Sequence, residues 1–198
     1  WVGLFKQYQE LLGVPVDMNE VFGKLYNHAL EGDADCGGLI AYNYISGEPV
    51  TGLAEGRPMF VRSANDHFNL ANFMRANLYA SAAVLKIGND VLFKDEKVQV
   101  DRITGHGGLF KTKGVGQRIL AAAINSPISV METAGEGGAW GIALLAGYLV
   151  NNEEKLSLAD YLDKKVFAGN TGVEIAPTAE DVAGFDKYIE TYKAGLAI

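Results

Sequence analysis

The chain has 198 residues, of which 48% are hydrophobic and 21% are charged, and its formal net charge is −7. This length and composition predict one well-buried domain, and the acidic balance argues against general nucleic-acid or membrane-surface binding, which calls for a basic face. No apolar run approaches the roughly 20 residues that span a bilayer, and the single cysteine, Cys36, excludes an internal disulfide and suits a reducing cytoplasm.

The N-terminal half of the sequence predicts helices around a single strand. Apolar residues at helical spacing predict a helix over residues 1–13. Because no initiator methionine or lead-in precedes Trp1, we expect the chain to be a fragment of a longer protein. Asp17 and Glu20 have the spacing of a capping box, so a second helix is predicted from there to about Glu31. A strand over residues 37–45 and a long helix over residues 68–93 follow.

The region 98–150 repeats one pattern, a strand, a glycine turn and a helix. The first copy is a strand at 98–104, glycines at 105–108 and a helix at about 112–125. The second is a strand at 127–131, glycines at 135–138 and a helix at about 139–150. Glycines let a ligand approach the backbone, and the free N–H groups at a helix start favour anions. Two short helices, at 158–167 and from about Thr178, complete one mixed α/β domain.

The two glycine turns have different candidate roles. The first is neither a Rossmann fingerprint, since Phe110 stands at the third glycine position, nor a Walker loop. It is therefore either a tight structural turn or a ligand loop. The second turn is expected to be structural, because its small residues let the next helix pack close to the sheet. Glu136 suits the helix dipole but would repel a phosphate there.

Other polar residues predict little chemistry by themselves. Lys111 and Lys113 could pair with phosphates, but exposed lysines beside a turn are usually solvated. Asp33 and Asp35 could serve as a general base or hold Mg²⁺, although an acidic loop that ends a helix is commoner. Cys36 lacks a partner that would make it a nucleophile, and His106 lacks a second metal ligand at suitable spacing. No catalytic or metal-binding residue is predicted.

Two segments carry a resemblance to a known family. The run GHGGLFKTKGVGQRILAAAINSPISVMETAGEGGAWGIALLAGYL resembles the C-terminal signature of the FGGY carbohydrate kinases, and AYNYISGEPVTGLAEGRPMFV resembles an upstream segment of these enzymes. The opening Trp-x-x-x-Phe helix and the tail are similar to xylulokinase and ribulokinase relatives. Asn43 and Pro49 depart from the family's usual Pro and Arg, and His106 stands where many relatives have Gly or Asp.

The resemblance implies a ribonuclease H-like (actin-like ATPase) fold, with a mixed sheet flanked by helices. Residues 1–198 would form the C-terminal nucleotide-binding domain of a cytoplasmic sugar kinase. By that resemblance Gly107 and Gly108 would lie against the nucleotide, with Thr112 at the polar position near the base or ribose. The first helix would form another wall of the adenine pocket.

The same resemblance implies an enzyme that transfers phosphate from ATP, with Mg²⁺, to a ketopentose such as xylulose. The sugar site and the catalytic aspartate would belong to an absent N-terminal domain, so the isolated chain is expected to be inactive. A homodimer is compatible with this reading, and no nucleic-acid or membrane partner is expected. The alternative is a non-catalytic actin-like nucleotide-binding or scaffold module without a sugar substrate.

Overall fold

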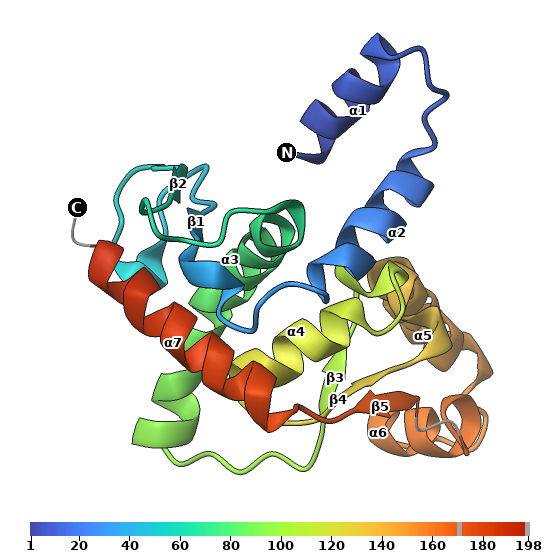
Figure 1. Cartoon of the computed structure of the whole chain (residues 1–198). Coiled ribbons are helices and arrows are strands. Elements are labelled where there is room, and N and C mark those ends of the chain that lie inside the picture. The colour runs from blue at the N-terminus through green and yellow to red at the C-terminus, as the bar shows by residue number, and fades with distance from the viewer. Residues whose placement is uncertain (170–171, 197–198) are drawn as a thin grey trace.

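Helices dominate the computed structural model, which describes residues 1–169 and 172–196 (Figure 1). The α-helices are α1 (Val2–Leu11), α2 (Met18–Ala29), α3 (Leu70–Asp90), α4 (Val115–Ile124), α5 (Gly137–Asn151), α6 (Leu158–Tyr161) and α7 (Ala179–Gly195). The short 3₁₀ helices are η1 (Cys36–Gly38), η2 (Pro49–Thr51), η4 (Gly108–Lys111) and η5 (Glu132–Glu136), and the π turns η3 (Val91–Asp95) and η6 (Leu162–Val166) extend α3 and α6.

The strands form two small sheets. They are β1 (Ile40–Tyr42), β2 (Met59–Val61), β3 (Ile103–Gly105), β4 (Ile128–Val130) and β5 (Val173–Ile175). β1 and β2 pair antiparallel, while β3, β4 and β5 form a mixed sheet in that order. β3 runs parallel to β4, with Gly105 opposite Val130, and β5 runs antiparallel to β4. The predicted mixed sheet flanked by helices is therefore confirmed.

Two strand predictions were wrong in extent, and two strands were not predicted. The strand predicted over residues 98–104 shrinks to β3 because Val98 and Val100 are exposed and have no apolar surface to pack against. The strand predicted over residues 37–45 begins only at Ile40, since the preceding glycines adopt positive φ angles in η1. Strands β2 and β5 were not predicted, because none of their residues is buried and they lack the buried face that β1 and β4 have.

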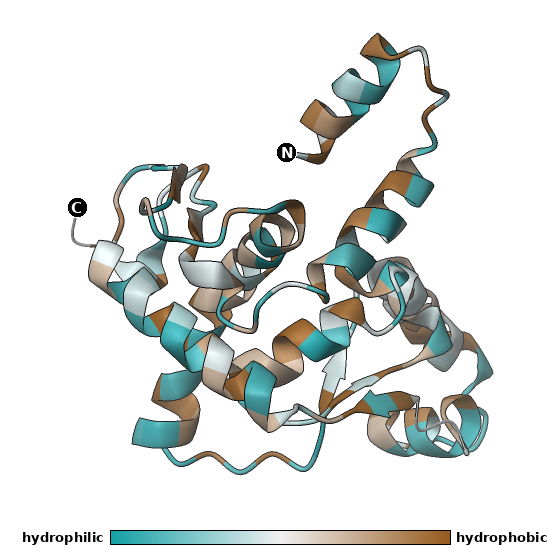
Figure 2. Cartoon of the chain, viewed as in Figure 1, coloured by the Kyte–Doolittle hydropathy of each residue, from teal (hydrophilic) through white to brown (hydrophobic). Residues whose placement is uncertain are grey.

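The helix starts follow the sequence more closely. Asp17 caps α2 by accepting a hydrogen bond from the Asn19 N–H (2.9 Å). The predicted cap of the last helix is also confirmed, since Thr178 Oγ1 accepts from the Asp181 N–H (3.1 Å). Brown and teal segments alternate along α1 and α2 in Figure 2, as expected for amphipathic helices. Phe22 of α2 is exposed.

The core gathers around α3, whose alanines allow neighbouring elements to come close. Ala76, Ala82 and Ala83 have no exposed surface, and α2, α4 and β1 all pack against this helix. Aromatic rings from α3, β1 and α7 pack against one another in this core. The ring centroids of Tyr79 and Phe185, for example, lie 4.6 Å apart. Tightly packed aromatic side chains contribute most of the buried apolar area.

A buried ion network joins three helices within this core. Asp181 of α7 accepts from Arg75 Nη2 of α3 (2.5 Å) and from Arg118 Nε of α4 (2.7 Å). The side chains of Arg75 and Asp181 are each 2% exposed. Burial alone would raise the pKa of Asp181, but the hydrogen bonds from Arg118, Thr178 and Arg75 outweigh it and lower the pKa to about 2. The carboxylate is therefore charged at neutral pH and holds α4 in place.

Candidate functional site

Two loops lie together at one edge of the mixed sheet. Because β3 and β4 are parallel, their carboxyl ends meet at the same edge, where α/β domains bind ligands. β3 runs into η4 and then α4, and β4 runs into η5 and then α5. The Gly107 N–H donates to the Ala134 carbonyl across the two loops (2.7 Å). The two strand–glycine–helix units of the sequence therefore form one composite surface.

Gly107 has a backbone conformation that other residues rarely adopt. Its φ is +107° and its ψ is −179°, a region that is essentially restricted to glycine. A Cβ atom placed on Gly107 or on Gly108 would meet no other atom within 4 Å. The Cβ directions of both glycines therefore point into open space, so a ligand can approach the backbone here.

Thr112 stands between η4 and α4. It is half-buried, and its hydroxyl makes no hydrogen bond within the part of the chain that the structure describes. A hydroxyl can donate and accept, so Thr112 can contact either kind of ligand group. Helix α4 follows at Val115 without a side-chain cap at Gly114. The predicted helix start near residue 112 is thus replaced by η4 and an extended Thr112.

The second loop packs against the first. A Cβ on Gly137 would lie 2.9 Å from His106 Nδ1, and one on Gly135 would lie 3.2 Å from Lys111 Cγ. The expected packing role of this glycine group therefore holds for these two positions, although their partners belong to the first loop and not to the sheet. Helix α5 already begins at Gly137, two residues earlier than predicted.

An ion pair across the loops uses one of the two lysines considered for phosphate binding. Lys111 Nζ lies 2.6 Å from Glu136 Oε1. The hydrogen bond and the charge of Lys111 lower the pKa of Glu136. Both side chains are largely exposed, so the pair adds little stability. It does mean that Lys111 is engaged by Glu136 in this structure.

A groove of about 990 Å³ opens beside these loops. Its walls come from η4, the start of α4, the end of β4, η5 and β5, and include Phe110, Lys113, Gln117 and Met131. Gly107, Gly108 and Thr112 do not line the groove, although Lys111 and Ala134 do. The structure therefore brings the three predicted nucleotide-binding residues next to this hollow, on the same composite surface.

Gln117 lines the groove and was given no role by the sequence. Only 5% of it is exposed, and its Nε2 donates to the carbonyls of Ile128 (2.9 Å) and Val173 (2.8 Å). The signal in the sequence is a lone amide among the apolar residues of α4. A buried amide in such a place must find hydrogen-bond partners.

The acidic loop before β1 has a structural role. Asp33 accepts from Asn72 Nδ2 (2.8 Å) and pairs with His67 Nδ1 (2.6 Å), and both hydrogen bonds lower its pKa. Asp35 accepts from the Gly37 N–H (3.0 Å) and pairs with Lys187. Burial raises the pKa of the Cys36 thiol well above its usual range, which disfavours the reactive thiolate.

Two further features bear on what the chain can bind. Within residues 1–169 and 172–196, no three His, Cys, Asp or Glu side chains lie close enough together to hold a metal ion. None of the helices in the described part of the chain is long and apolar enough to cross a bilayer.

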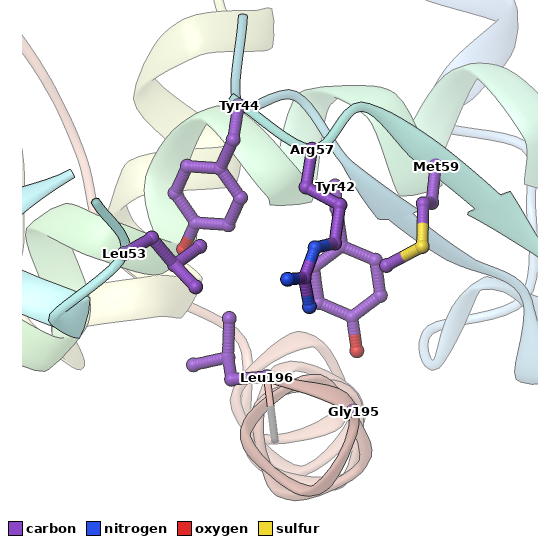
Figure 3. A pocket seen from close by; sticks show the side chains of 7 residues that line it. All are labelled: Tyr42, Tyr44, Leu53, Arg57, Met59, Gly195 and Leu196. Carbon is purple, nitrogen blue, oxygen red and sulfur yellow. The ribbon is translucent and has the colours of Figure 1, made fainter. Parts of the chain in front are cut away.

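A small hollow at the opposite end of the molecule is a packing gap. Figure 3 shows Tyr42 and Arg57 on one side and Tyr44 with Leu53 on the other, above the end of α7. Its volume of about 10 Å³ is close to that of a single water-sized sphere. It is too small for a substrate.

The chain is an α/β domain whose candidate ligand surface lies at the ends of its parallel strands. A family model described as the FGGY family of carbohydrate kinases, C-terminal domain, matches residues 2–150, and the chain belongs to this family. The fold is accordingly ribonuclease H-like, of the actin-like ATPase type. A comparison with curated protein sequences gave no match.

Solved structures show the same fold. Xylulose kinase from Rhodospirillum rubrum aligns with a TM-score of 0.61 at 20% identity, over 90% of this chain and 34% of that one. Plasmodium falciparum glycerol kinase with ADP aligns with a TM-score of 0.65 at 20% identity, over 98% and 36%. Gluconate kinase from Lactobacillus acidophilus gives 0.61 at 22%, over 87% and 34%. The chain therefore spans about a third of the length of these kinases.

Proposed function

We propose that residues 1–198 are the nucleotide-binding domain of a sugar kinase and bind the adenosine of ATP on Gly107, Gly108 and Thr112. The observation that carries this proposal is the open, glycine-only conformation of Gly107 beside the equally open Gly108. A flat base can rest on such a backbone, and the unpaired Thr112 hydroxyl can contact the base or ribose. ATP supplies the phosphoryl group, and this chain's part is to bind and orient it.

The remainder of the kinase would supply the sugar site and the catalytic base. Helix α5 supports such a missing partner surface: it carries no charged residue, yet none of its residues is buried. Leu149 and Val150 are each more than 80% exposed. An apolar helix is normally covered on most sides, so a longer protein would pack here. Alone, the chain would bind ATP weakly and transfer no phosphate.

The substrate we propose is a ketopentose such as xylulose, because xylulose kinases are among the matching structures and the sequence resembles that branch. Glycerol and gluconate kinases match as well. A panel of sugars with the intact protein distinguishes these substrates. Phosphorylation of none of them would favour the non-catalytic alternative. Mg²⁺ would be held mainly by the ATP phosphates and by residues outside this chain.

The decisive experiment replaces Gly108 with leucine in the intact protein. A side chain there meets open space, so the variant should fold, but it should block the adenosine. We expect a KM for ATP at least about tenfold higher, with the KM for the sugar unchanged. Gly23→Leu is the matched control, because a Cβ on Gly23 also meets nothing within 4 Å but lies in α2, outside the two glycine loops. An unchanged KM for ATP in Gly108→Leu would refute the placement of the nucleotide.

A further inference from the structure

A single buried amide ties the helix after the nucleotide loop to the sheet. Gln117 lies on the buried side of α4, among Val115, Ile119 and Ala121. Its two N–H groups donate to carbonyls of two different strands, Ile128 of β4 and Val173 of β5. A leucine would fill a similar volume without the cost of burying an amide. The amide must therefore contribute something other than apolar packing.

The first turn of α4 has few other polar anchors. Gly114 provides no side-chain cap, and the contact from the Val115 N–H to the Thr112 carbonyl is long at 3.4 Å. The neighbouring Arg118 holds the other side of α4 through its ion pair with Asp181 of α7. Gln117 and Arg118 thus fix the same turn from opposite sides, one to the sheet and one to α7.

The nucleotide loop rests directly on this turn. A Cβ on Gly116 would lie 2.9 Å from Leu109 Cγ and 3.1 Å from the Leu109 carbonyl, so α4 and η4 touch at the residue next to Gln117. Any shift of α4 relative to the sheet would therefore move η4, and with it Gly107 and Gly108.

We infer that Gln117 is a positioning residue. By anchoring α4 to β4 and β5, it holds the loop of Gly107, Gly108 and Thr112 in the position that binds ATP. This inference rests on the proposed function, because it assumes that ATP binds on that loop. Gln117 itself does not touch the nucleotide in this arrangement. Its effect passes through Gly116 and η4.

The test compares Gln117→Leu and Gln117→Glu with the wild type in the intact protein. Leucine removes both donors and retains most of the volume, while glutamate retains the shape but offers acceptors to two carbonyls. For both variants we expect roughly tenfold weaker ATP binding by calorimetry and a matching rise in the KM for ATP. The KM for the sugar and the kcat at saturating ATP should stay near those of the wild type. Deuterium exchange at residues 105–112 should become faster.

The control is Tyr192→Phe, which removes a buried hydrogen bond to the Tyr44 hydroxyl (2.6 Å) at a site remote from α4. If Tyr192→Phe lowers the melting temperature but leaves ATP binding intact, general destabilisation does not explain the effect at Gln117. Wild-type affinity for ATP in both Gln117 variants, or an equal loss of ATP and sugar binding, would overturn the positioning role alone. Absence of ATP binding by the wild type would instead overturn the proposed function, and the inference with it.

Discussion

Replacing Asp181 with asparagine removes the negative charge at the centre of the buried network. Asp181 lies 2.5 Å from Arg75 and 2.7 Å from Arg118, and the side chains of Asp181 and Arg75 are almost completely buried. In the variant, Arg75 would keep its hydrogen bonds to Tyr79 and to the Gly32 carbonyl but would lose its counter-charge. Removing one partner of a buried pair costs about 3–5 kcal/mol.

The pKa of Asp181 gives a second view of the same interaction. A fall from the ordinary value of 3.8 to about 2 corresponds to about 2.5 kcal/mol of stability. Because the folded-state pKa is depressed, this stability is present above pH 4 and is lost as the pH falls from about 4 to about 2. The figure is smaller than the cost of the substitution, because protonation leaves the carboxyl group in place.

The assay is thermal and urea unfolding of the chain, followed by circular dichroism at pH 7 and at several pH values between 2 and 5. The loss of 3–5 kcal/mol should lower the melting temperature by about 6–20 °C, at about 2–4 °C per kcal/mol for a chain of this size. Glu20→Gln, which breaks an exposed pair with Lys24, is the control and should leave the midpoint essentially unchanged.

The reasoning would be refuted if Asp181→Asn unfolded within about 1 kcal/mol of the wild type, which is well below the cost of an unpaired buried charge. A second result would also count against it. If the variant lost stability between pH 4 and pH 2 as steeply as the wild type, another group would be responsible for that acid sensitivity.

Two further predictions concern the glycine loop and the tyrosines. Gly107→Ala should lower the free energy of unfolding by about 1–3 kcal/mol, because alanine is strained at φ +107°. Gly108→Ala should leave the free energy of unfolding nearly unchanged. Urea denaturation measures both variants, and equal effects would argue against the backbone conformation described for Gly107. Burial raises the pKa of Tyr79 to about 12 and also raises the pKa values of Tyr188 and Tyr192. Unfolded tyrosines ionise near pH 10, so stability should fall as the pH rises from about 10 towards 12, and absorbance at 295 nm should change together with the loss of helix. Ionisation of all nine tyrosines near pH 10 with the helices intact would contradict this.

The helices were more predictable than the strands. The caps at Asp17 and Thr178 and the apolar spacing of α3 are local signals, and the structure contains all three elements. β2 and β5 are three residues long, and their pairing depends on partners far away in sequence. Their side chains are exposed or only partly buried, so no buried face marks them locally and only the partner's position identifies them.

The candidate site also combines features that the local sequence predicts with contacts that only the folded chain shows. The glycine turn after the first predicted strand was recognisable from the sequence, whereas Gly107, Gly108 and Thr112 were chosen through the family resemblance and their contact with a nucleotide stays a proposal. The bond from Gly107 to Ala134 and the contacts of Gln117 join residues that are 27 and up to 56 positions apart. Nothing in the local sequence specifies which carbonyls a buried glutamine will meet.

The sequence by itself determined the mixed α/β class and where the main helices lie, because periodicity, caps and glycine turns act over a few residues. The family followed from the resemblance of whole segments to the FGGY signature. Only the tertiary structure decided that the second glycine group packs on the first loop, that α4 is held by Gln117 and Arg118, and that the acidic loop is structural. Those outcomes depend on which surfaces come into contact when the chain folds. Every charge and amide that becomes buried by this contact needs a hydrogen-bond or ion-pair partner.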